Sequence, residues 1–203
     1  GAQIVVGNIA PFVFPPDQSF TVQAWIQTGS LQNQVIAARS GAWSLGLKDG
    51  RVSAWMMQDG QQFVEAVGEA DAADGKWHHV AAVFDRDAQT LTLYLDGQPD
   101  GIPGNIAAIG GSSSASSLTI GSLGGPFPLD GTLDEISIHR AVLSPAEFSF
   151  GADYAPALTA KLGAQIGTYT TAPCDWGQPV RVISLLTMAE ANDGTITANL
   201  ETS

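Results

Sequence analysis

Two pairs of adjacent residues carry the side chains best suited to acid–base or metal chemistry. They are the carboxylates Asp134 and Glu135 and the imidazoles His78 and His79. Each pair falls in a segment of alternating apolar residues, and neighbours along a β-strand point to opposite faces of the sheet. We therefore expect neither two-carboxylate catalysis nor a zinc pair, and we interpret the histidines as core or edge residues. The sequence also lacks G-x-S-x-G, H-E-x-x-H and Walker motifs.

A tryptophan points to a different chemistry, the binding of a ligand by stacking. Residues 52–57 alternate between apolar positions that face the core and a second set that faces outward. The outward set and the residue just beyond it are Ser53, Trp55, Met57 and Gln58. Aromatic rings and amides are typical of sites that bind sugars, so we predict that these residues contact a carbohydrate or protein ligand. The alternatives are that Trp55 contacts a neighbouring domain or is covered by the C-terminal residues.

The bulk composition narrows the classes of partner. The chain has 203 residues, with eight Lys+Arg against twenty Asp+Glu and a net charge of −12. Nucleic acid and anionic membranes both attract basic surfaces, so we expect neither as a partner. No apolar run approaches the ~18 residues of a membrane span. Cys174 is the only cysteine, which excludes an intrachain disulfide.

The clearest structural pattern lies in residues 74–97, DGKWHHVAAVFDRDAQTLTLYLDG. Residues 77–84 are apolar on both faces, which is typical of a strand covered on both sides. Residues 85–88 form a polar turn, and residues 90–96 place every second side chain, a leucine, on one face. Asp96-Gly97 favours another turn. The segment therefore predicts an antiparallel hairpin inside an all-β domain.

The same patterns divide the chain into a sandwich and a tail. Further strands are expected at residues 3–6, 20–27, 34–39, 44–48, 52–57, 62–67, 118–121 and 132–139. Asp49-Gly50 predicts a hairpin turn between the strands at 44–48 and 52–57. Ser144-Pro145-Ala146-Glu147 has the cap, the first-turn proline and the glutamate of a capping box, and predicts one short helix. We assign residues 1–150 to one domain. Residues 151–203 are expected to be a β-rich tail or the start of a following domain. Strands at 180–186 and 195–200 should form a β-hairpin that turns at residues 192–194.

Four segments, in this order, resemble the laminin-G-like branch of the concanavalin A-like lectin/glucanase superfamily. They are SFTVQAWIQT, WSLGLKDGRVSAWM, DGKWHHVAAVFD with LTLYLDG, and LTIGSLGG with LDGTLDEISIHRAVLSPAEF. The resemblance implies a jelly-roll β-sandwich of two antiparallel sheets. It also implies that Trp25 is a core residue, because the tryptophan at this position of the family is usually buried.

The resemblance carries two expectations about chemistry. Glucanases of the superfamily bear alternating acidic residues along one strand, and no E-x-D-x-E run occurs here, so we expect a non-enzyme. Many relatives bind a structural calcium ion through a carboxylate on the last strand, and Asp134 matches that position. Asp130 and Asn8 would add oxygen ligands if they lie near, although VVGNIAPF replaces the family's usual F-D-G-x-D. The alternative is that Asp134 only accepts local hydrogen bonds.

These expectations combine into one functional hypothesis. We expect a non-catalytic binding or adhesion module of a larger secreted or cell-surface protein, with carbohydrate as the first ligand class. Residues 1–8 show no signal-peptide pattern, so any export signal would precede this sequence. The alternative is an accessory sandwich packed against the catalytic domain of a larger enzyme, since SFTVQAWI also resembles domains embedded in dimethylformamidase-type amidases.

Overall fold

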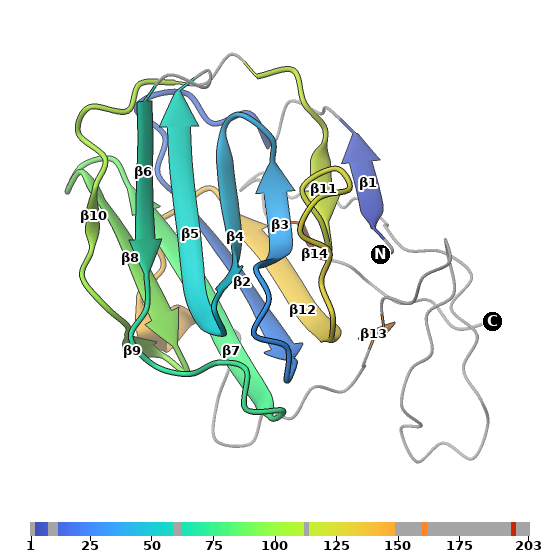
Figure 1. Cartoon of the computed structure of the whole chain (residues 1–203). Helices are drawn as coiled ribbons and strands as arrows, with labels where there is room; N and C mark the ends of the chain where they lie inside the picture. Colours follow the sequence, from blue (N-terminus) through green and yellow to red (C-terminus); the bar gives the residue numbers. More distant parts are fainter. Residues whose placement is uncertain are drawn as a thin grey trace.

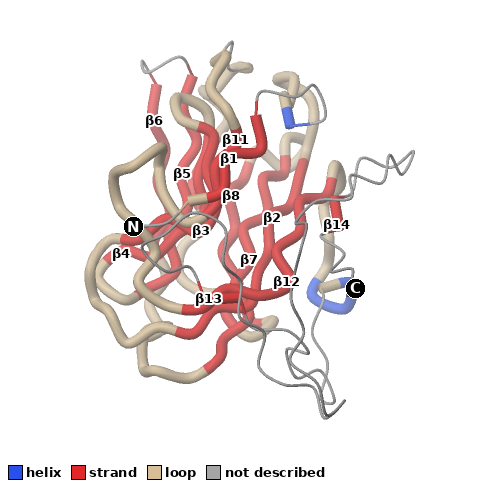
Figure 2. Tube along the Cα trace, turned by 90° about the vertical axis from the view of Figure 1, so that its right-hand side faces the viewer, coloured by secondary structure: helices blue, strands red, loops and turns tan. Residues whose placement is uncertain are grey.

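The computed structural model describes residues 3–7, 12–58, 62–111 and 114–148, and the backbone of residues 160–161 and 196–197. Two antiparallel sheets pack face to face (Figures 1 and 2). The six-stranded sheet has the spatial order β1 (Ile4–Gly7), β11 (Leu118–Ile120), β3 (Gln34–Arg39), β4 (Trp43–Lys48), β5 (Arg51–Gln58) and β6 (Gln62–Val67). The eight-stranded sheet contains β10 (Gly104–Asn105), β8 (Thr90–Leu95), β7 (Trp77–Asp85), β2 (Phe20–Gln27), β12 (Thr132–His139) and β13 (Ala160–Lys161), with β9 (Gln98–Pro99) on β8 and β14 (Ile196–Thr197) on β12. The predicted two-sheet all-β sandwich is confirmed.

The core lies between the sheets and follows the alternation of the strands. On β2 the inward side chains are fully buried; they are Phe20, Val22, Ala24 and Ile26. The ring of Phe20 stacks on Phe14 at 3.9 Å and on Phe84 at 4.2 Å between centroids, and Trp43 tilts against it at 5.6 Å. Aromatic side chains bury large apolar areas, so this cluster joins β2, β4 and β7 across the sandwich.

Strand β7 is covered on both faces, as its sequence predicts. Its inward residues belong to the main core, whereas Ala81 and Val83 on the opposite face are buried in a second, smaller cluster. Phe148 covers that cluster, and Tyr94 and Leu143 pack against it. The second cluster therefore consists of β7, β8 and the segment that follows β12.

Two Asp-Gly turns set the register of neighbouring strands. Asp49 and Gly50 join β4 to β5 with φ angles of 51° and 79°, and Asp96 and Gly97 join β8 to β9 with φ angles of 49° and 75°. Positive φ at both central residues defines the tight hairpin turn whose twist matches that of the strands. Both predicted turns are confirmed. The two-residue strands β9 and β10 were not predicted, because two residues are too few to show a periodicity.

The expected helix is a single 3-10 turn, η2 (Pro145–Glu147). The Glu147 carboxylate accepts hydrogen bonds from the Ser144 backbone N–H at 2.9 Å and from the Ser144 hydroxyl at 2.7 Å. Phe148 follows the turn directly, and its ring packs in the second cluster. Among the described residues, no helix is long and apolar enough to span a membrane.

One core assignment was wrong. Trp25 is half-buried on the outer face of the eight-stranded sheet, because the inward positions of β2 are the even-numbered ones. Its ring meets the ring of His79 edge-on at 5.7 Å. The predicted hairpin at residues 192–194 and the strand at 180–186 lie outside the described residues. The domain boundary at residue 150 stays a prediction.

Candidate functional site

Exposed aromatic side chains gather on the outer face of the six-stranded sheet. The strands β5 and β6 pair so that Met57 lies opposite Phe63 and Trp55 opposite Glu65. The rings of Trp55 and Phe63 are 6.2 Å apart with an interplanar angle of 38°, and Phe63 is 54% exposed. Such a pair offers apolar ring surface to a ligand, because exposed patches of this kind mark binding sites more often than isolated side chains do.

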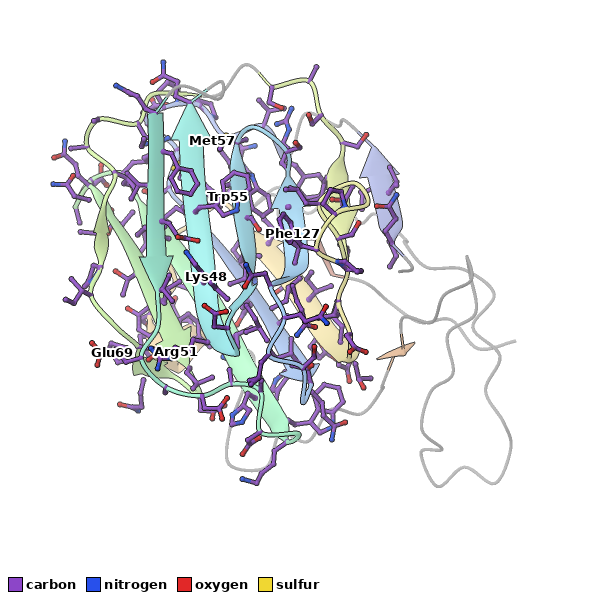
Figure 3. The ribbon with its side chains drawn as sticks, in the orientation of Figure 1. Lys48, Arg51, Trp55, Met57, Glu69 and Phe127 are labelled. Carbon is purple, nitrogen blue, oxygen red and sulfur yellow. The ribbon has the colours of Figure 1, made fainter. Side chains whose placement is uncertain are left out.

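Phe127 extends this surface across the sheet. It is 48% exposed in the loop after β11, and its carbonyl accepts a hydrogen bond from the Val35 N–H at 3.0 Å. Figure 3 shows it on the same side of the sheet as Trp55 and Met57. Small buried residues of β3 and β4 continue the row from Trp55, since Trp55 pairs with Ser44 and Ser44 with Ala38. We call Trp55, Met57, Phe63 and Phe127 the aromatic face.

An ion pair lies beside the aromatic face. The Lys48 ammonium contacts the Glu65 carboxylate at 2.5 Å, with 40% and 25% of the two side chains exposed. The hydrogen bond to Glu65 and its negative charge raise the pKa of Lys48. Because Lys48 and Glu65 both point outward, the pair places one hydrogen-bond donor group and one acceptor group next to the ring of Trp55.

The predicted ligand residues do not all lie together. Trp55 and Met57 lie on the aromatic face, and Ser53 points to the same side but is 8% exposed. Gln58 lies at the end of β5, where its side-chain oxygen accepts the Gly110 N–H at 2.8 Å. The sequence therefore predicted correctly that Trp55 and Met57 lie on one accessible surface. The prediction that Gln58 belongs to the same surface was wrong.

Sequence reasoning missed other residues of this surface. The pairing of β5 with β6 would have revealed Phe63 and Glu65, since both alternate in phase with Trp55 once Gln58 is aligned with Gln62. The Asp49-Gly50 turn would have revealed Lys48 in the same way, because this turn sets the pairing of β4 with β5. Phe127 had no such signal, because it lies in a Gly/Pro-rich loop without periodicity.

The predicted calcium ligands contribute few oxygens in the described part of the chain. The half-buried Asp134 uses one carboxylate oxygen to accept the Glu135 N–H at 2.8 Å, and Asp130 is exposed. Asn8 lies outside the described residues, and within these no group of three or more His, Cys, Asp or Glu could hold a metal. The described side chains alone do not fit the six to eight oxygens that calcium takes.

A β-bulge changes the geometry expected for Asp134 and Glu135. The register with β2 shifts between Asp134 and Ser137, and Glu135 has a φ of 49°. Leu133 and Ile136 both contact the core, so the strict alternation that was assumed for the two carboxylates was wrong. A bulge places two residues opposite one and redirects their side chains.

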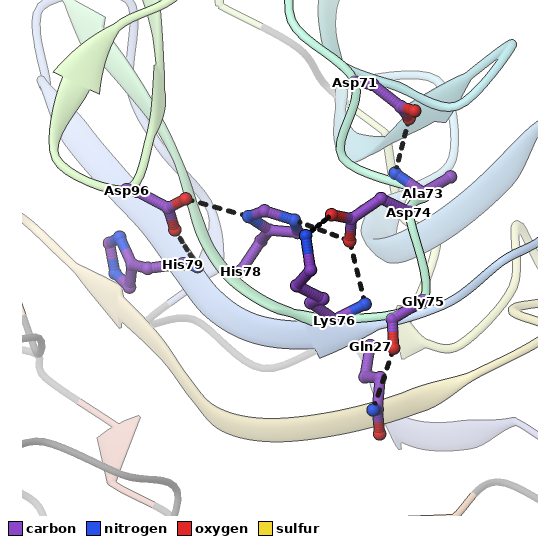
Figure 4. Close-up of polar contacts among 9 residues, drawn as sticks. All are labelled: Gln27, Asp71, Ala73, Asp74, Gly75, Lys76, His78, His79 and Asp96. Atoms are coloured by element: carbon purple, nitrogen blue, oxygen red, sulfur yellow. Dashed lines mark hydrogen bonds and ion pairs between the residues drawn. The ribbon is translucent and has the colours of Figure 1, made fainter.

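The two adjacent histidines have different surroundings, which Figure 4 shows. His78 lies between the carboxylates of Asp96 at 2.8 Å and Asp74 at 3.1 Å. Burial lowers the pKa of His78 and the hydrogen bonds to Asp96 and Asp74 raise it, with a net upward shift. Hydrogen bonds from Lys76 hold the pKa of Asp74 well below its usual range. This cluster connects the loop before β7 to the turn after β8.

His79 is fully buried on the outer face of the eight-stranded sheet, where its Nε2–H donates to the side-chain oxygen of Gln23 at 2.9 Å. Burial lowers the pKa of His79 to about 4, while the charge of Asp96 acts weakly in the opposite direction. The imidazole is therefore neutral at pH 7 and fills space beneath Phe148, whose ring lies at 5.4 Å. The expectation that these histidines are core or edge residues is confirmed.

Comparison with known structures finds sandwiches of the same kind. The chain superposes on the binding domain of Paraclostridial Mosquitocidal Protein 1 with a TM-score of 0.60 at 16% identity, over 71% of this chain and 39% of that one. For domains LG4-5 of the mouse laminin alpha1 chain the TM-score is 0.52 at 19% identity, over 75% and 43%. For the Ruminococcus gnavus IT-sialidase CBM40 bound to alpha2,3 sialyllactose it is 0.54 at 17% identity, over 64% and 80%.

The chain spans about two fifths of the first two of these structures. A search of the curated proteins found no match. The family profile described as concanavalin A-like lectin/glucanases superfamily matches residues 3–149. That match covers the strands β1 to β12 and the turn η2, and the chain belongs to this superfamily.

Proposed function

We propose that the chain is a non-catalytic binding module of a larger secreted or cell-surface protein, and that it binds carbohydrate on the aromatic face. The observation that carries the proposal is the pair of the half-buried Trp55 and the exposed Phe63 beside the Lys48–Glu65 ion pair. Sugar rings stack on aromatic faces, and their hydroxyl groups bond to charged and amide side chains. The described surface offers both kinds of contact within neighbouring strands.

The absence of catalysis is part of this proposal. Hydrolysis of a glycoside uses two carboxylates that face each other across the scissile bond. The six cross-strand pairs of β5 and β6 contain a single carboxylate, Glu65, which Lys48 holds in an ion pair. We expect the purified protein to turn over no β-glucan. Turnover that a single Asp or Glu substitution abolishes would contradict this.

The binding proposal is tested by screening the protein on a glycan array and then measuring the affinity of each hit by calorimetry. Trp55→Ala and Phe63→Ala should each weaken binding about fivefold or more, because the stacking of a ligand ring on one aromatic side chain is worth on the order of 1–3 kcal/mol when the ligand ring is a base. Ile102→Ala is the matched control, since Ile102 is 81% exposed in a loop of the other sheet. Hits whose affinity is unchanged in both aromatic variants would place carbohydrate binding elsewhere.

A second candidate function uses the same surface. The chain covers less than half of several longer neighbours, and an exposed aromatic face would also suit packing against another domain of the same polypeptide. In that case the isolated chain binds no glycan, and Trp55 becomes protected from solvent only in the longer protein. Quenching of tryptophan fluorescence by acrylamide, compared between wild type and Trp55→Phe in both forms, separates this function from the first.

A further inference from the structure

A pocket of about 340 Å³ lies where the two sheets meet at one end of the sandwich. Its walls are Pro16, Gln58 at the end of β5, Arg86 and Gln89 of the β7–β8 turn, and the loop of residues 106–110. None of the residues of the aromatic face lines it. The volume is at the lower end of the range for small-molecule sites, and the mixture of apolar walls with a few polar groups is typical of such sites.

Among the described residues that line the pocket, Arg86 is the one that carries a charge. Its guanidinium donates hydrogen bonds to the backbone carbonyls of Ile109 at 2.7 Å and Gly110 at 3.2 Å, which fix its position. No carboxylate of the described residues forms an ion pair with Arg86, and its Nε is buried without a partner. Burial lowers the pKa of Arg86, yet a guanidinium stays charged in proteins. The pocket thus contains an uncompensated, partly desolvated cation.

In the described part of the chain, the acidic residues that flank Arg86 in the sequence form no ion pair with it. Asp85 uses its carboxylate to accept the N–H groups of Asp87 and Ala88, each at 2.9 Å. Neither Asp85 nor Asp87 lines the pocket. In a chain with a net charge of −12, a pocket whose described lining contains an arginine and no carboxylate favours an anionic ligand.

Two amides complete the site. The Gln58 side-chain oxygen accepts the Gly110 N–H, so its NH₂ group remains as a donor. Gln89 is the second amide among the residues that line the pocket. Ile106 and Ile109 are buried, which gives the site apolar walls on either side of Ala107 and Ala108. Hydrogen bonds from a guanidinium to an anion are charge-assisted and stronger than those between neutral groups.

We propose that this pocket is a second binding site, which takes a monosaccharide-sized ligand that carries one carboxylate. A single guanidinium balances one negative charge, and its planar N–H groups match a carboxylate. A dianionic phosphate would leave a charge without a counterpart. The Gln58 and Gln89 amides then bond to hydroxyl groups, and the apolar walls contact the ring. The site is independent of the aromatic face.

The test is a titration of the isotopically labelled full chain with glucuronate, followed by amide chemical shifts. Glucose and inorganic phosphate are the comparison ligands, since glucose lacks the carboxylate and phosphate lacks the ring. We expect millimolar glucuronate to shift the amides of Gln58, Arg86 and residues 106–110, and neither comparison ligand to do so. Equal shifts with glucose or phosphate, or no shift with glucuronate, overturn the proposal.

Variants of Ala108, an exposed residue that lines the pocket, test whether the charge of Arg86 attracts the ligand. They remove no contact that stabilises the fold. Ala108→Glu places a negative charge beside Arg86 and should weaken glucuronate binding about fivefold or more. Ala108→Gln has the same length without the charge and should leave the affinity unchanged. Equal affinities of the two variants contradict the electrostatic argument. Trp55→Ala should leave glucuronate binding unchanged, which separates this site from the proposed function of the aromatic face.

Discussion

The outer faces of the two sheets differ in whether another segment of the described chain covers them. On the eight-stranded sheet, Ala81 and Val83 are buried beneath Phe148, with Tyr94 and Leu143 packed alongside. On the six-stranded sheet, no described segment covers Phe63, which stays 54% exposed beside Trp55. Both faces are built from the same two-residue alternation of their strands.

The difference lies in what packs on top of each sheet. The chain leaves β12 and returns over β7 through residues 141–148, so the outer apolar residues of β7 contribute to folding. The aromatic face receives no such segment from the described part of the chain. Its apolar area is therefore available to stabilise a complex rather than the fold.

The largest expected effect comes from removing the cover of the eight-stranded sheet. Phe148→Ala should lower the free energy of unfolding by about 3 kcal/mol, because it deletes a buried ring and leaves a cavity over Ala81 and Val83. Phe63→Ala, the matched change on the open face, should alter it by less than about 0.5 kcal/mol. Urea denaturation of both variants measures the contrast. Similar losses in the two variants would mean that the faces do not differ in this way.

The second-largest effect is expected from acid, which should lower the free energy of unfolding through His79 on the covered face. The pKa of His79 is about 4 in the folded protein against a usual value of 6.5. Between these values the unfolded chain binds a proton that the folded protein does not, so stability falls as the pH decreases from about 6.5 to about 4. The loss amounts to roughly 3 kcal/mol at the lower limit. Unfolding free energies measured across this pH range test it.

Two variants separate the histidines in that experiment. His79→Gln should flatten the dependence below pH 6.5. His78 has a raised pKa, so its contribution is complete below about pH 6.5 and is lost as the pH rises through the folded value. His78→Gln should therefore lower the stability by a constant amount below about pH 6.5 and change the slope of the profile only where the pH rises through the folded pKa of His78. An unchanged acid slope in His79→Gln would assign the slope to the carboxylates.

A smaller effect is expected on the open face. Lys48→Gln removes the ion pair with Glu65, and exposed ion pairs contribute roughly 0–1 kcal/mol to stability. We expect a change in melting temperature of only a few degrees, together with a weaker affinity for any ligand of the aromatic face. The outcome that contradicts this is a loss of stability as large as that of Phe148→Ala.

The smallest effect concerns Asp134 at the bulge of β12. Asn accepts the Glu135 N–H as Asp does, so Asp134→Asn should leave the melting temperature in EDTA unchanged. The calcium prediction requires a rise in melting temperature with calcium for the wild type and no rise for Asp134→Asn, since calcium binding stabilises only the folded site. Equal melting temperatures of the wild type in calcium and in EDTA would contradict calcium binding.

Much of the fold was determined by the sequence itself. The alternation of residues 20–27 and 62–67 predicted β2 and β6 with the bounds that the structure has. Asp49-Gly50 and Asp96-Gly97 predicted their turns because few residues other than Asn, Asp and Gly tolerate positive φ. These features are local, since they depend on the backbone preferences of residues that are neighbours along the chain.

Exposure was decided by the tertiary structure. Trp25 and Trp55 both occupy outward positions of their strands, yet Trp25 contacts the buried His79 and Trp55 lies beside the exposed Phe63. The alternation specifies to which side of a sheet a residue points, but not which distant segment packs there. The same limit applies to Arg86, whose pocket forms from β5, the β7–β8 turn and the loop of residues 106–110. Only the packing of these distant segments brings the candidate sites together, because no local pattern encodes contacts between residues far apart in the chain.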